Sequence, residues 1–91
     1  MENVEIDIHA LREMESELEA FKSSITGHCD DMESAVSTSR SVLEDNKSQQ
    51  ACQKIENACT MIKDSLGYVQ RALERVRDVI EKAEKAEQSE M

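Results

Sequence analysis

The fold is decided by residues 52–83, which read CQKIENACTMIKDSLGYVQRALERVRDVIEKA. Apolar residues recur through this stretch at alternating steps of three and four, at Cys52, Ile55, Cys59, Ile62, Leu66, Val69, Leu73, Val76, Ile80 and Ala83. Such a repeat keeps one stripe of a helix directed at a partner helix along its whole length. The stretch therefore predicts a long amphipathic helix that packs side by side with another helix.

A second seam with the same spacing lies in the N-terminal half of the chain. Its members are Val4, Leu11, Met14, Leu18, Phe21, Ile25, His28, Met32, Ala35, Ser39 and Val42. The chain contains no proline to interrupt either seam. We predict a first helix over residues 5–43 with this seam buried against the second helix.

Gly27 is the one candidate break inside the first helix, since glycine costs about 1 kcal/mol relative to alanine in a helix interior. The apolar repeat nevertheless passes from Ile25 to Met32 without a slip. A turn would seldom preserve that phase, so the pattern favours a continuous or kinked helix over a three-helix arrangement.

The predicted turn lies at residues 44–48, because apolar residues stop between Glu44 and Gln50. Helix-capping types gather there, and Asn46 followed by Gln49 resembles a capping box. We expect a second helix over 48–87 and a frayed tail at 88–91. Two helices of similar length joined by a short turn fold back antiparallel. The fold class is then all-α, with residues 1–91 forming one coiled-coil-like helical hairpin.

Such a hairpin has a thin core. The chain has 91 residues, with one Phe, one Tyr and no Trp to fill a closed globule. Two helices offer only two facing stripes with which to exclude water. We therefore expect further burial against a second chain, in a homodimer or with another protein, for example as a four-helix bundle.

The net charge of −9 argues against nucleic acid and anionic membranes as partners, because both are polyanions. All of the excess lies in residues 1–45, which hold 12 acidic and 3 basic residues, whereas residues 46–91 hold 8 of each. In an antiparallel hairpin the acidic start of the first helix would lie beside the basic part of the second. The residues concerned are Glu13, Glu15, Glu17 and Glu19, and Arg71, Arg75, Arg77, Lys82 and Lys85.

No apolar run approaches the roughly 20 residues of a membrane span, and the N-terminus lacks the pattern of a cleaved signal peptide. Cys52 and Cys59 lie seven residues, or about 10 Å, apart on one helix, which is too far for a disulfide. They are typical of small apolar residues in a reducing compartment. We expect a cytoplasmic protein without membrane insertion, which could be exported together with a partner.

Candidate chemical sites are few. The residues from His28 to Asp31 form the one cluster of potential metal ligands, but their spacing matches no zinc pattern. The chain has no Gly-rich phosphate loop, and two packed helices offer no pocket for nucleophilic catalysis. We expect no enzymatic activity, no metal and no cofactor.

A row of mostly small residues runs along the second helix, at Ala51, Ala58, Ser65, Ala72, Val79 and Ala86. Small side chains allow another helix to approach closely. Packing against the first helix is the favoured interpretation of this row, and docking of a second chain is the alternative. If a partner binds, we expect it to contact Leu18, Phe21, Ile25, Ala58, Ile62, Ser65, Val69, Ala72, Val76 and Val79.

The chain resembles the Trp-x-Gly-type helical hairpins of bacterial type VII secretion, and in particular the small partners of LXG-type effectors. The resemblance rests on size, acidity and the two amphipathic helices. It rests also on Ile6 and Asp7 leading into the first seam, and on residues 48–51 (SQQA) opening the second helix. The turn lacks the Trp-x-Gly motif, and Tyr68 is followed four positions later by Ala72 rather than by an acidic residue. The resemblance implies a targeting partner that binds an effector by helix-bundle packing. The alternative is a structural coiled-coil scaffold that forms a homo-oligomer.

Overall fold

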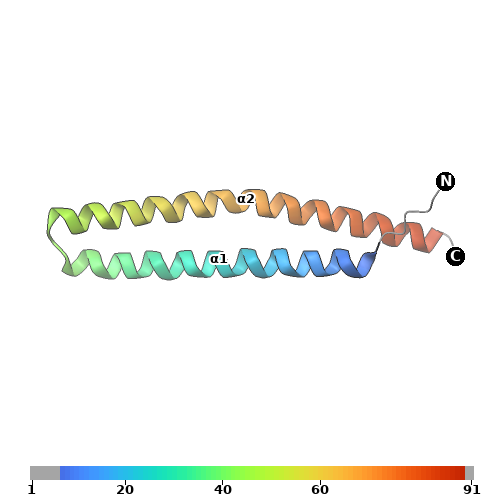
Figure 1. Ribbon diagram of the computed structural model, residues 1–91, viewed down its shortest axis with the longest axis horizontal. Coiled ribbons are helices and arrows are strands. Elements are labelled where there is room, and N and C mark those ends of the chain that lie inside the picture. Colours follow the sequence, from blue (N-terminus) through green and yellow to red (C-terminus); the bar gives the residue numbers. More distant parts are fainter. Residues whose placement is uncertain (1–6, 90–91) are drawn as a thin grey trace.

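The computed structural model describes residues 7–89, which form two antiparallel helices joined by a short turn (Figure 1). Helix α1 spans Ile8–Val42 (35 residues) and helix α2 spans Asn46–Ser89 (44 residues). At 1.5 Å per residue they are about 52 and 66 Å long. The predicted all-α hairpin is confirmed.

Asp7 fixes the start of α1. Its side chain accepts a hydrogen bond from the backbone N–H of Ala10 at 3.1 Å, so Asp7 is the N-cap and the helix begins at Ile8. The predicted start at residue 5 lies outside the described residues, as do Val4 and Ile6. At the other end α2 continues to Ser89, beyond the predicted end at residue 87, while residues 90 and 91 again lie outside the described part.

The turn is shorter than predicted because Asp45, and not Asn46, caps α2. The Asp45 carboxylate accepts hydrogen bonds from the backbone N–H (3.0 Å) and the hydroxyl (2.7 Å) of Ser48. These bonds lower the pKa of Asp45 below its usual value. Asn46 is already the first residue of the helix, so the predicted capping box on Asn46 is wrong. On the other side, the N–H of Leu43 donates to the carbonyl of Ser39 at 2.8 Å and closes α1.

Helix α1 passes through Gly27 without interruption, and no described residue has a positive φ. A Cβ built on Gly27 would meet nothing within 4 Å, so this position needs no glycine for close packing. The prediction of a continuous first helix is confirmed.

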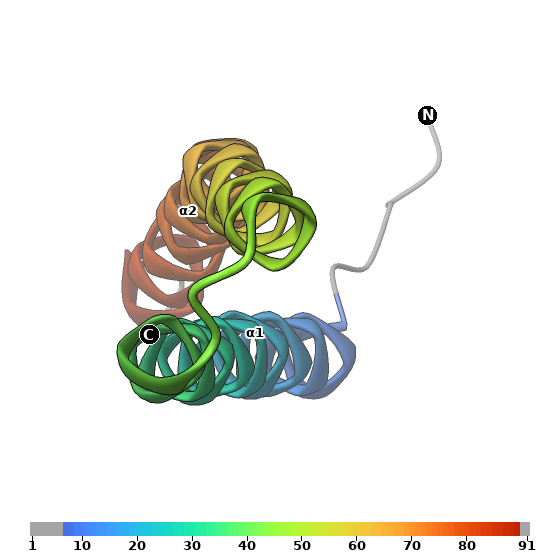
Figure 2. The same cartoon turned by 90° about the vertical axis from the view of Figure 1, so that its left-hand side faces the viewer.

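The two helices cross slightly as they run (Figure 2). The core between them is a single line of side chains. On α2 the line consists of residues seven apart, with Ala83 beside its end: Cys52, Cys59, Leu66, Leu73, Ile80 and Ala83. Leu73, with 2 % of its surface exposed, is the most buried of them. From α1 only Cys29 and Val36 are buried. The core is thin, as the composition predicts.

The predicted seam of the first helix is wrong at six of its ten described positions. Continued towards the N-terminus by steps of seven, the line through Val36 and Cys29 reaches Lys22 and Glu15 rather than apolar residues. Both polar side chains have partners on α2, since Glu15 pairs with Arg77 at 2.8 Å and Lys22 donates to Gln70 at 2.5 Å. This satisfies them at the interface and turns the other seam positions to the surface. The exposed ones are Met14, Phe21, His28, Met32, Ala35 and Val42.

Candidate partner-binding face

One side of the hairpin carries cross-helix ion pairs, which we call the polar ladder. Each step of seven residues down α1 is matched by a step of seven up α2, and the central step falls on the uncharged residues Thr26 and Gln70. The pairs are Arg40 with Glu56 (2.6 Å), Glu33 with Lys63 (2.7 Å), Glu19 with Arg77 (3.1 Å) and Arg12 with Glu84. The constant step shows that one register is kept over the length of the hairpin.

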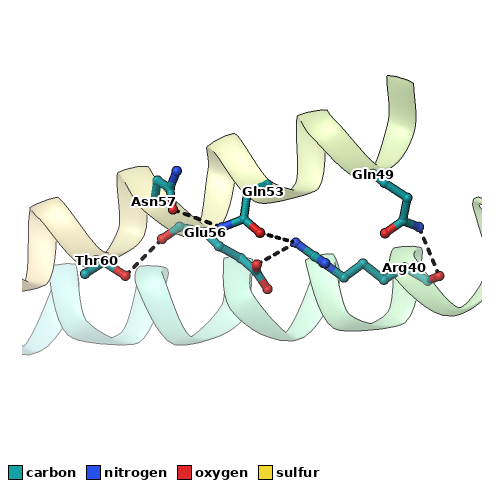
Figure 3. Close-up of polar contacts among 6 residues, drawn as sticks. All are labelled: Arg40, Gln49, Gln53, Glu56, Asn57 and Thr60. Carbon is teal, nitrogen blue, oxygen red and sulfur yellow. Dashed lines mark hydrogen bonds and ion pairs between the residues drawn. The ribbon is translucent and has the colours of Figure 1, made fainter. Parts of the chain in front are cut away.

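Near the turn the ladder is reinforced by amide side chains (Figure 3). Arg40 reaches from α1 to α2, where it donates to Gln53 at 3.3 Å as well as to Glu56. Gln49 donates back to the carbonyl of Arg40 at 3.4 Å. These bonds join the last turn of α1 to the first turns of α2.

Further along, Lys63 lies between two carboxylates of α1, Glu33 and Asp30, the second at 2.9 Å. Hydrogen bonds to both raise the pKa of Lys63. Arg77 is held in the same way by Glu15 and Glu19, and its pKa is also raised. The predicted pairing of the acidic start of α1 with basic residues of α2 is thus confirmed for Arg77.

Not all of the predicted charge pairs form. Within residues 7–89, Glu13 is paired with His9 of its own helix at 3.1 Å, and Lys82 with Asp78 at 3.2 Å. Arg71 lies over the ring of Tyr68, 4.6 Å from its centre. The ladder therefore uses only part of the basic surface of α2.

The ladder weakens at its centre, where Thr26 stands opposite Gln70. An open groove of about 520 Å³ lies there, lined by side chains that include Lys22, Gln70 and Arg77. The polar atoms of these three residues are already engaged across the helices. The groove is a gap in the ladder rather than a site prepared for a ligand.

The opposite side of the hairpin is apolar, as helix geometry shows. On α2 the ladder residues follow the buried line by four positions, whereas Ile62 and Val69 follow it by three. At 3.6 residues per turn these offsets lie on opposite flanks of the line. On α1 Glu33 follows Cys29 by four positions, and Ile25 precedes it by four. Because the ladder rows meet each other on one side, the apolar rows meet on the other.

We call this side the apolar face. All ten predicted contact residues belong to it, and none is buried by the hairpin itself. Phe21 is 51 % exposed, Ile62 43 % and Val79 36 %. The half-buried members are Leu18, Ile25, Val69 and Val76, and the small exposed members are Ala58, Ser65 and Ala72.

The row of small residues on α2 does not pack against α1. Ala51, Ala58, Ser65, Ala72 and Ala86 are all exposed, so the favoured interpretation of this row is wrong. The physical reason is the rotation of α2, which directs the line of Cys52 to Ile80 at α1 and leaves the small residues beyond it. Helix α1 therefore covers the buried line but not the small residues.

Three large apolar residues were not among the predicted contacts and also lie on this face. Met14 is 51 % exposed, Met32 47 % and Ile55 37 %. The sequence placed all three in the inter-helix seams instead. Glu15 and Lys22 occupy the alternative phase of α1, but that phase is selected by their partners on α2, so the local sequence held no signal that could have corrected Met14 and Met32.

Chemical sites are not favoured by the geometry. Cys29, Cys52 and Cys59 are free and buried, and burial raises the pKa of Cys59. Among residues 7–89 no three His, Cys, Asp or Glu side chains converge as metal ligands. His28 is exposed.

No helix in the described part of the chain has the length and apolarity that crossing a membrane requires. Comparisons with protein-family models, with curated proteins and with solved structures find no match for the chain.

Proposed function

We propose that the protein is a small helical partner that binds a second helical protein through its apolar face. By the resemblance of its sequence, that protein is an LXG-type effector or another small hairpin, and the complex is a helix bundle destined for type VII secretion. The bundle forms in the cytoplasm, and the partner covers apolar surface that the hairpin leaves in water. No catalytic step is involved.

One observation carries this proposal, namely the apolar face itself. Monomeric soluble proteins rarely leave a large contiguous apolar surface exposed, and such surfaces mark interaction sites. Here Phe21, Met32 and Ile62 are each more than 40 % exposed on one side of the hairpin. The small residues Ala58 and Ala72 beside them allow a helix to approach closely.

The alternative function is that of a structural coiled-coil scaffold. It is favoured by the ladder, because paired long helices of fixed register are also the building unit of scaffolds. A scaffold would form a stable homo-oligomer whose apolar face does not accept a foreign helix. The two functions differ in whether the apolar face accepts a helix of a foreign protein.

The test is co-purification of the chain with the helical N-terminal region of an LXG-type effector from the same genome. We expect one complex in size-exclusion chromatography with light scattering. Ala58→Arg with Ala72→Arg, which places two charges on the face, should abolish it. Asp64→Arg is the matched control, since Asp64 is exposed and lies outside the apolar face.

A complex that survives both arginines would disprove binding through this face. If no effector region from the genome binds and the chain forms a stable homo-oligomer, the scaffold is the better account. A pull-down from the native organism with mass spectrometry would then identify which protein, if any, takes the place of the effector.

A further inference from the structure

We infer that the apolar face also binds a second copy of the chain, with α1 of each copy on α2 of the other and both turns at the same end. This inference goes beyond the proposed function. The homodimer covers the face while the partner is absent, and the partner displaces the second copy.

The charges along the edges of the face carry this inference. Three residues beyond Met14 and His28 on α1 lie Glu17 and Asp31, and that row holds no basic residue. The other edge lies on α2, three residues beyond Ala51, Ala58, Ser65, Ala72 and Val79. Its members are Lys54, Met61, Tyr68, Arg75 and Lys82. The face is therefore bordered by acidic residues on α1 and by basic residues on α2.

Glu17 and Arg75 lie at the same height along the hairpin. Glu15 contacts Arg77 at 2.8 Å, and the helices are antiparallel. Two residues forward in α1 and two residues back in α2 therefore lead to the same level. Glu17 and Arg75 are both exposed, and neither forms an ion pair within residues 7–89.

Symmetry brings these two charges together. A twofold axis parallel to the helices stacks the two faces without any shift along the hairpin. Each α1 then lies on the α2 of the other copy, and Glu17 of one copy meets Arg75 of the other, twice per dimer. The row of small residues with Ala58 and Ala72 lies where α2 of one copy packs on α1 of the other and the two helices must approach closely.

The other twofold arrangement is disfavoured by the same charges. An axis across the helices would lay α1 on α1 and α2 on α2. With the axis placed so that Glu17 faces Asp31, Lys54 of one copy would also face Lys82 of the other. Like charges in contact disfavour such a pairing.

The face is large enough for a stable dimer. It runs along the whole of α1, about 52 Å, and is two helices wide, which is roughly 18 Å at ordinary helix spacing. Stable interfaces cover about 800 Å² on each partner. A flat surface of this length and width already has this area, and the side chains that project from it add to the area.

The inference is tested on the purified full chain alone, by light scattering and sedimentation over a concentration series. We expect a species of twice the 10.3 kDa chain mass. Glu17→Arg and Arg75→Glu should each weaken dimerisation about tenfold, because each turns two attractive pairs into repulsive ones. The double variant should return to within about twofold of the wild type. Asp64→Arg is the control, and circular dichroism verifies that every variant stays helical.

A chain that remains monomeric at roughly 100 µM overturns the homodimer. Single reversals without effect, or a double variant that is not restored, overturn the arrangement. Neither result touches the proposed function, because effector binding is measured with the effector region and reported by Ala58→Arg with Ala72→Arg.

Discussion

The two long sides of the hairpin differ in where their side chains find partners. On the polar side, Arg12, Glu33 and Arg40 form ion pairs with residues of the other helix. On the apolar side, Phe21 and Met32 remain about half exposed. The difference shows that one side pairs the chain's own helices, whereas the other remains exposed and is the side that we propose for binding a second chain.

The order of charges in the ladder explains how one register is chosen. A slip of one heptad in one direction would bring Arg12 to Arg77 and Glu33 to Glu56. A slip in the other direction would bring Glu19 to Glu84 and Arg40 to Lys63. Each slip thus creates two like-charge pairs, whereas the observed register creates none. Individual exposed pairs contribute only about 0 to 1 kcal/mol, so the ladder selects the alignment more than it holds the fold.

The largest effect is expected between the two sides, in the buried line. Leu73→Ala should lower the free energy of unfolding by about 3 kcal/mol, because it leaves a cavity at the most buried position. For a chain of this size the Tm should fall by more than about 10 °C. Val79→Ala on the apolar face is the matched control and should change the Tm of the monomer little. Equal losses in thermal melts of the dilute chain would mean that the face belongs to the hairpin's own core.

The next effect concerns assembly through the apolar face. Phe21→Ser with Ile62→Ser should weaken binding of the effector region by roughly a hundredfold, because each side chain contributes on the order of 1.5 kcal/mol of apolar burial. Isothermal titration calorimetry measures this loss. Thr60→Ala with Asn57→Ala, on the outer side of α2, provides the control. Binding that survives the serines would show that this face is not the one used.

A smaller effect is expected from the polar ladder. Lys63→Glu should lower the Tm by several degrees, because it places a third carboxylate beside Asp30 and Glu33. Glu33→Lys should lower it less, since Asp30 remains as a partner of Lys63. The double exchange should recover most of the loss. Melts at low and high salt test the cause, and losses unaffected by salt would contradict an electrostatic origin.

The smallest effect is expected at the turn. Asp45→Ala removes the cap of α2 and should lower the Tm by a few degrees at pH 7. The folded state lowers the pKa of Asp45, so the contribution of this residue is fully present above the usual value of 3.8. It is lost as the pH falls through the lowered pKa, where Asp45 becomes protonated. Melts of the wild type and the variant should therefore converge once the pH is below the lowered pKa of Asp45, and a difference that persists in the acid-protonated state would exclude the carboxylate as the cause.

The sequence predicts α2 and the hairpin well, because the repeat from Cys52 to Ile80 has a single apolar phase. It does not decide the rotation of α1. Leu11, Leu18 and Ile25 are compatible with two seams, one through Phe21 and the other through Lys22. The seam through Phe21 contains more apolar residues, so the sequence pattern favours that seam.

The second phase is adopted because Arg77 and Gln70 lie opposite Glu15 and Lys22. These partners are 62 and 48 residues away in sequence. No local pattern could reveal them. The ten predicted contact residues lie on one side of the hairpin in this arrangement, and their role in binding stays a prediction.

Hydroxyl-radical footprinting of the chain, as a dilute monomer and in the assembled state, tests the separation of the two sides most directly. The exposed thioethers of Met14 and Met32 report on the apolar face, and the exposed ring of His9 reports on the surface outside it. The account predicts that assembly protects both methionines severalfold and leaves His9 unchanged. Equal labelling of Met14 and Met32 in both states would contradict it.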